Sequence, residues 1–169
     1  MKATTTLVPL ITLAACGAVR PSSPEERAAR SPHADTSFAA LQERGASAMG
    51  VDQYTSAHRF DDLPDGGRIE LRRSGDPAGV AAIREHLKAI TTAFSRGDFS
   101  TPAFVHSREV PGTATMSARR EEIRYEYRDL PGGGEVRITT RDPEALRAVR
   151  AFLRFQRMDH RAGGHVHPR

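Results

Sequence analysis

The stretch LPDGGRIELRRSGDPAGVAAIREHL, residues 63–87, decides the fold because a second version of it, LPGGGEVRITTRDPEALRAVRAFL, occupies residues 130–153. Each copy contains a glycine-rich turn, a segment that alternates polar and apolar residues, an Asp-Pro pair and an amphipathic segment. The alternation, as in RIEL at 68–71, is typical of a strand with one buried face. The Asp-Pro pairs at 76–77 and 142–143 are typical of helix starts. We therefore predict an internal duplication of a ββα unit.

The segments around the two copies complete the predicted fold. Residues 51–60 and 123–127 are expected to form the first strand of each unit, paired across the turn with the strand that follows. A short helix is expected over 36–48, and the connection over 99–116 contains prolines and glycine that predict an ordered loop. Apolar residues recur at steps of three and four after each Asp-Pro pair. We predict an α+β fold, a four-stranded antiparallel sheet with two helices on one face and a pseudo-twofold axis.

The first sixteen residues carry one charge, Lys2, then a short apolar run that ends in LAAC at 13–16. This pattern resembles the lipobox of a bacterial lipoprotein signal, and its cysteine is the only one in the chain. The apolar run is too short to span a bilayer permanently. The resemblance implies that Cys16 carries lipid and that the protein is exported and anchored to a membrane. Gly17 after the cysteine favours the outer membrane, facing the periplasm. The alternative is an ordinary secretory peptide with a chance cysteine.

Composition divides the remainder of the chain. Residues 17–36 are rich in proline, serine and charge and predict a disordered tether. Residues 37–162 hold the duplicated domain, and a chain of this length has room for one such core. Residues 163–169 predict a flexible tail that contains two histidines.

The chain carries a formal net charge of +4, and nearly all of its basic residues are arginine. Four arginines, at positions 147, 150, 154 and 157, follow one flank of the second amphipathic segment. Such a stripe can attract phosphates. No aromatic residues interleave with it as single-strand binders require, so we expect a solvated face and no nucleic-acid partner.

Histidine and methionine are the residues that best support a chemical hypothesis. With Cys16 lipidated, the mature protein has no free thiol, while the chain contains seven histidines and four methionines. Imidazole and thioether groups suit copper in an exported protein. The candidate ligands are His58, His86, His106, His160 and Met116. They come from five separate segments, and a buried histidine is also commonly satisfied by a carbonyl or carboxylate, so a purely structural role stays open.

Several motifs resemble a family of small exported bacterial proteins that are often labelled aspartate carbamoyltransferase. They are MGVDQ at 49–53, GDF at 97–99, Pro111-Gly112 and FLRFQ at 152–156 followed by Asp159-His160, together with His58, His106 and Met116. The resemblance covers most of the chain and implies no secure activity. The chain is far too short for a two-domain carbamoyltransferase and lacks a Ser-Thr-Arg-Thr phosphate-binding run.

No motif for hydrolysis or nucleotide binding is present in the sequence, neither G-x-S-x-G nor a Walker loop nor G-x-G-x-x-G. We therefore lean toward a function without catalysis. The sequence favours a lipid-anchored protein of the cell envelope that binds a ligand, with copper as the expected metal. The alternative is a structural or protein-interaction lipoprotein with no ligand chemistry, and the sequence names no protein partner.

Overall fold

Both Asp-Pro pairs begin long helices in the computed structural model, which describes residues 32–162. Helix α3 spans Pro77–Ser95 and helix α6 spans Pro143–Asp159. The Asp76 carboxylate accepts a hydrogen bond from the Gly79 backbone N–H at 2.9 Å, and the Asp142 carboxylate caps α6 in the same way. The predicted helix starts are confirmed. The lipobox with Cys16, most of the tether and the histidine-containing tail lie outside the described residues.

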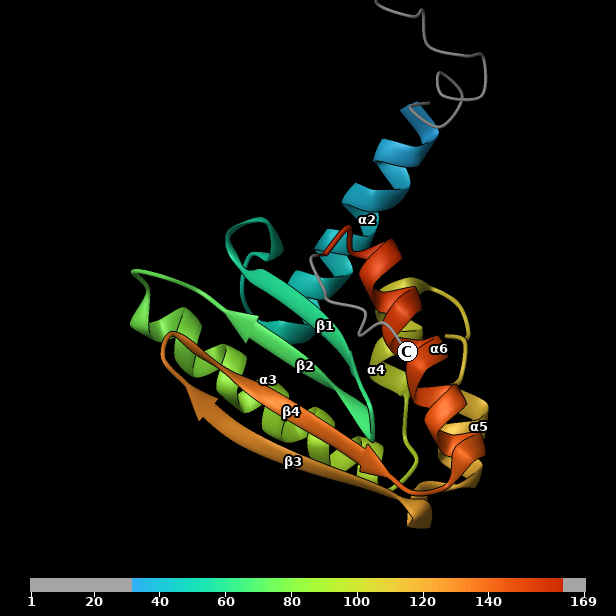
Figure 1. Ribbon diagram of the computed structural model, residues 1–169. Helices are drawn as coiled ribbons and strands as arrows, with labels where there is room; N and C mark the ends of the chain where they lie inside the picture. The colour runs from blue at the N-terminus through green and yellow to red at the C-terminus, as the bar shows by residue number, and fades with distance from the viewer. Residues whose placement is uncertain (1–31, 163–169) are drawn as a thin grey trace, which may run out of the picture. The chain divides into compact units, whose positions relative to one another are not determined.

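Four strands form one antiparallel sheet in the order β1-β2-β4-β3 (Figure 1). The two hairpins bring β2 and β4 together at the centre, where Ile69 lies opposite Val136. These two residues occupy equivalent positions in the repeats, so the pseudo-twofold axis passes between them. The predicted α+β fold is confirmed. The strand bounds are Ala57–Leu63 for β1, Gly66–Arg72 for β2, Ile123–Leu130 for β3 and Gly133–Thr140 for β4.

The two long helices cover one face of the sheet, and each covers the strands of the other repeat. Helix α3 packs on β3 and β4, whereas α6 packs on β1 and β2. A Cβ at Gly67 would overlap the Leu153 side chain, and one at Gly134 would lie 3.0 Å from Leu87 Cδ1. Both glycines and both leucines are equivalent pairs in the repeats. The halves are therefore interlocked, and one core serves both.

The first part of the domain differs from the prediction. Helix α2 spans Pro32–Met49, so it begins within the segment expected to be a tether and extends the helix predicted over 36–48. A 3₁₀ turn, η1, occupies Gln53–Thr55, where a strand was expected from residue 51. Asp52 is the cause, because its carboxylate accepts a hydrogen bond from the Tyr54 N–H at 2.8 Å and starts the turn.

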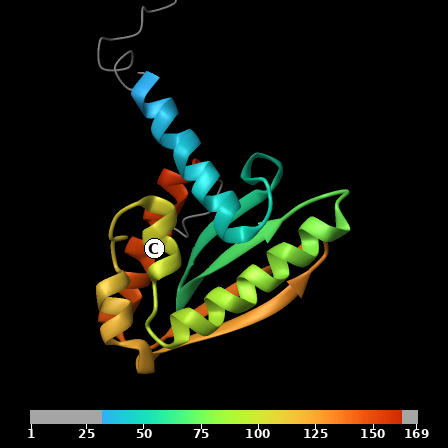
Figure 2. The same cartoon turned by 180° about the vertical axis from the view of Figure 1, so that it is seen from behind.

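The connection between the repeats is helical, so the expectation of a loop over 99–116 is wrong. It contains α4 at Ser100–His106 and α5 at Thr113–Ala118, followed by a 3₁₀ turn, η2, at Arg120–Glu122. The Asp98 carboxylate accepts a hydrogen bond from the Ser100 N–H at 2.8 Å at the start of α4. Helix α4 packs on α2, and α5 packs on α6 (Figure 2).

The arginine stripe of α6 is only partly solvated, which corrects the expectation for that flank. Arg147 and Arg154 are exposed. Arg157 donates to both carboxylate oxygens of Asp62, at 3.1 and 3.0 Å, and to the Phe60 carbonyl at 2.8 Å. The stripe therefore helps to fasten α6 to β1.

Candidate functional site

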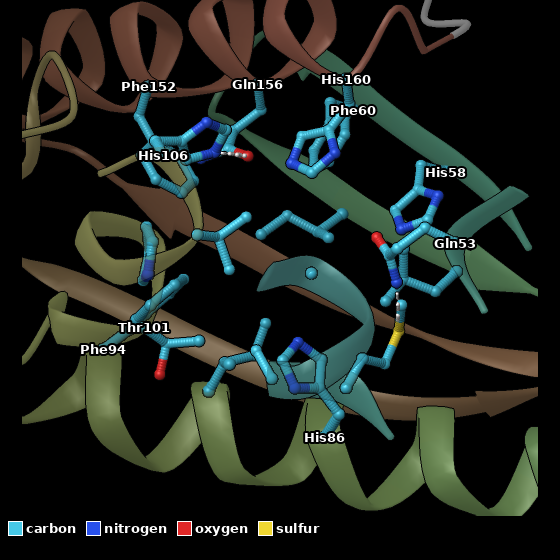
Figure 3. Close-up of a pocket in the computed structure, with 18 residues that line it drawn as sticks. Gln53, His58, Phe60, His86, Phe94, Thr101, His106, Phe152, Gln156 and His160 are labelled. Atoms are coloured by element: carbon cyan, nitrogen blue, oxygen red, sulfur yellow. Dashed lines mark hydrogen bonds between the residues drawn. The ribbon is translucent and has the colours of Figure 1, made fainter. Parts of the chain in front are cut away.

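A cavity of about 80 Å³ lies in the core, where α2, α3, α4 and α6 meet the β1–β2 side of the sheet. Among the described residues, its lining is largely apolar and contains no carboxylate, thiol, lysine or arginine. The volume suits a few water molecules or a metal ion, and it is far below the 300–1,000 Å³ typical of pockets for drug-sized ligands. Figure 3 draws the lining residues, which are Gly45, Ala48, Met49, Gln53, His58, Phe60, Ile69, Leu71, His86, Ile90, Phe94, Thr101, Pro102, Val105, His106, Phe152, Gln156 and His160.

Four of the five candidate ligands line this cavity, although they come from four different elements. His58 belongs to β1, His86 to α3 and His106 to the end of α4, and His160 follows α6. The His160 ring centroid lies 5.0 Å from that of His106 and 5.4 Å from that of His58. His86 points toward the cavity from the opposite side (Figure 3). The convergence of these side chains is a property of the fold, since they are far apart in the sequence.

Met116 does not belong to the cavity. It lies in α5, and its fully buried side chain packs in the hydrophobic core. The thioether that lines the cavity is that of Met49, whose sulfur accepts a hydrogen bond from the Gln53 amide at 3.9 Å. Met49 and Gln53 both belong to the MGVDQ motif, to which the sequence assigned no role.

His58 holds one ring nitrogen against a backbone carbonyl. Its Nδ1 atom lies 3.2 Å from the Ser56 carbonyl oxygen. A carbonyl oxygen can only accept, so this nitrogen donates its hydrogen. The second ring nitrogen then keeps its lone pair. This is the arrangement that orients histidine ligands in metal sites.

His160 has a buried nitrogen without a hydrogen bond. Its Nδ1 atom is excluded from solvent and has no partner in the part of the chain that the structure describes. A buried polar atom without a partner costs on the order of 1–3 kcal/mol. Such an atom beside a cavity marks a place where a ligand would gain an interaction.

His106 differs because both of its nitrogens are engaged. Nδ1 lies 2.5 Å from Asp159 Oδ2, and Nε2 lies 3.0 Å from Gln156 Oε1. Its side chain is only 1% exposed. Whichever way the Gln156 amide is turned, neither nitrogen of His106 is left for a further ligand. Both ring nitrogens of His106 therefore have hydrogen-bond partners, which fits the structural role that the sequence analysis kept as an alternative.

Burial keeps three of the histidines neutral. It lowers the pKa of His160 to about 3, with His58 and His106 contributing in the same direction. Burial also lowers the pKa of His58 to about 4, reinforced by His86 and opposed by the Ser56 carbonyl. The pKa of His86 is lowered for the same reason. At neutral pH His58, His86 and His160 therefore present uncharged imidazoles to the cavity, the form that binds metals.

The rings are not arranged around a common point as they stand. His58 and His160 stack with an angle of 9° between their planes, whereas an imidazole lone pair lies in the plane of its ring. Among residues 32–162, no three histidine, cysteine, aspartate or glutamate side chains are grouped so that they could hold a metal ion. Two of the rings must therefore rotate before they can share a ligand.

Comparisons with protein-family models, with curated proteins and with solved structures found no match to this chain. The helices within residues 32–162 are all too short or too polar to cross a membrane.

Proposed function

We propose that this chain is a non-enzymatic binding protein of the cell envelope, and that its ligand is held by neutral histidines in the core cavity. The observation that carries the proposal is the Nδ1 atom of His160, which has no hydrogen-bond partner among residues 32–162 and is buried beside His58 in a cavity whose described lining has no carboxylate, lysine or arginine. A cavity that served only for packing would gain stability from an apolar residue at this position.

Copper in its Cu(I) state is the ligand that the lining favours. Without a carboxylate or thiolate, the cavity has nothing to balance a divalent charge, and a buried charge without a partner is costly. A monovalent ion carries less of this penalty. Neutral imidazoles and the Met49 thioether are ligands that Cu(I) accepts. Haem is far larger than a cavity of about 80 Å³.

The envelope location rests on the sequence around Cys16. A lipid on this cysteine would hold the protein at a membrane, and the residue after it favours the periplasmic face of the outer membrane.

The second candidate is a structural or protein-interaction lipoprotein without a ligand. The saturated hydrogen bonds of His106 favour it, since this histidine already has two partners. In this case the four histidines only fill space in the core, and the cavity holds water.

Titration calorimetry separates these two functions. The background chain carries Cys16→Ser, His165→Gln and His167→Gln, so that neither the thiol nor the tail histidines bind metal. It is titrated with Cu(I), Cu(II), Zn(II) and haem. We expect saturable binding of Cu(I), at least tenfold weaker in His160→Gln. Met116→Leu is the matched control and should bind as the background chain does. No saturable binding of any of the four would favour the structural candidate.

A further inference from the structure

A second depression lies on the surface beside the cavity, between α2, the end of α4 and the end of α6. Its volume is about 320 Å³, and its lining includes three arginines, Arg44, Arg108 and Arg161. Asp159 is the one carboxylate among the lining residues that the structure describes. His106 borders both this depression and the core cavity.

Asp159 is already engaged, so it does not neutralise all of this positive charge. One of its oxygens lies 2.5 Å from His106 Nδ1, and the other lies 3.4 Å from Arg108 Nη2. Arg44 uses its Nε atom to donate to the Val105 carbonyl at 2.7 Å. A guanidinium group has five N–H donors, so Arg44 and Arg108 each retain donors beyond these bonds.

The contacts that the arginines make also hold them in place. The Arg108 guanidinium lies 4.7 Å from the centre of the Phe155 ring, and that of Arg161 lies 4.1 Å from the centre of the Phe38 ring. Stacking on an aromatic face fixes the plane of a guanidinium while leaving its edge to donate. The three groups therefore line the depression from separate elements, and Arg44 and Arg108 are each held by a contact that leaves other donors available.

We propose that this depression, which we call the arginine pocket, binds a phosphate group as its dianion. One guanidinium can satisfy a planar carboxylate through two parallel hydrogen bonds. Three guanidinium groups approaching from different sides suit a tetrahedral dianion, whose oxygens point in different directions. The group can come from free phosphate or from the headgroup of phosphatidic acid. The arginine pocket does not depend on the metal proposed for the core cavity.

The test uses the full chain and two probes. Inorganic phosphate is titrated against amide NMR signals at constant ionic strength, and vesicles of phosphatidylcholine with or without phosphatidic acid are used for co-sedimentation. We expect saturable binding of at least one probe, weakened at least tenfold by Arg44→Gln and by Arg108→Gln. Arg108 is exposed, so its replacement should leave the fold intact. Arg124→Gln, an exposed arginine of β3, is the control and should not change binding.

The outcomes are distinct. Binding of phosphate that depends on Arg44 and Arg108 indicates a soluble ligand, and binding of phosphatidic acid alone with the same dependence indicates a lipid headgroup. No saturable binding of either probe overturns the proposal. Binding that Arg124→Gln weakens as much as Arg44→Gln also overturns it, because general attraction to a basic surface would then be the cause.

Discussion

Acidification to pH 5 should destabilise this protein far more than its carboxylates can explain. Burial lowers the pKa of His58 to about 4 and that of His160 to about 3, from 6.5 in both cases. The unfolded chain therefore takes up protons first as the pH falls below 6.5, and the folded state loses stability. At pH 5 each histidine is 1.5 pH units below its unfolded pKa, which corresponds to about 2 kcal/mol at 1.36 kcal/mol per unit. Together they account for about 4 kcal/mol.

Denaturant unfolding at pH 7.5 and pH 5.0 measures this loss. Aspartates whose folded pKa is lowered, such as Asp65, keep their stabilising effect above their unfolded pKa of 3.8 and lose it only below that value. The loss of stability between pH 7.5 and pH 5.0 therefore reports on the histidines. The double variant with His58→Gln and His160→Gln is the control, and it should lose most of the pH dependence whatever its stability at pH 7.5. An equal loss in both proteins, or a wild type equally stable at the two values, would refute the neutral histidine cluster.

Three further predictions concern the fold and the anchor. Gly67→Ala places a methyl group on Leu153 and should lower the free energy of unfolding by roughly 1–3 kcal/mol. Combined with Leu153→Ala, the loss should be smaller than the sum of the two single losses, and an unchanged midpoint in urea for Gly67→Ala would contradict the interlocked packing. Arg157→Met leaves the half-buried Asp62 unpaired and should lower the free energy of unfolding, measured by thermal unfolding, by about 3 kcal/mol. The loss should be smaller when Asp62→Asn is added, and losses of the two single variants that simply add would argue against the ion pair. Labelled palmitate should enter the wild type and not Cys16→Ser, and label in both would exclude the lipid anchor.

The sequence was sufficient for the duplicated units because their signals are local. An Asp-Pro pair caps a helix through atoms a few residues apart, and alternation along a strand depends only on which face is buried. The helices α4 and α5 were missed for the opposite reason. Helices of six or seven residues are unstable alone and form here because they pack on α2 and α6.

The sequence predicted the residue types of the site but not their arrangement, because the arrangement depends on contacts between distant elements. Residue type identified His58, His86, His106 and His160 as candidates, but no local pattern brings four distant elements to one cavity. The choice of Met116 followed from its chemistry alone, whereas the thioether at the cavity comes from Met49, which α2 places there. The hydrogen bonds that occupy His106 depend on tertiary contacts with α6, which no spacing in the sequence indicates.

Nuclear magnetic resonance of the histidine ring nitrogens tests most directly whether the cavity binds Cu(I). The ion is diamagnetic, so the ¹⁵N signals of His58, His86, His106 and His160 can be followed in the background chain before and after one equivalent is added. Our account predicts large shifts for Nδ1 of His160 and Nε2 of His58, with both nitrogens of His106 unchanged. Cavity histidines that do not respond, or shifts at His106 alone, would contradict it.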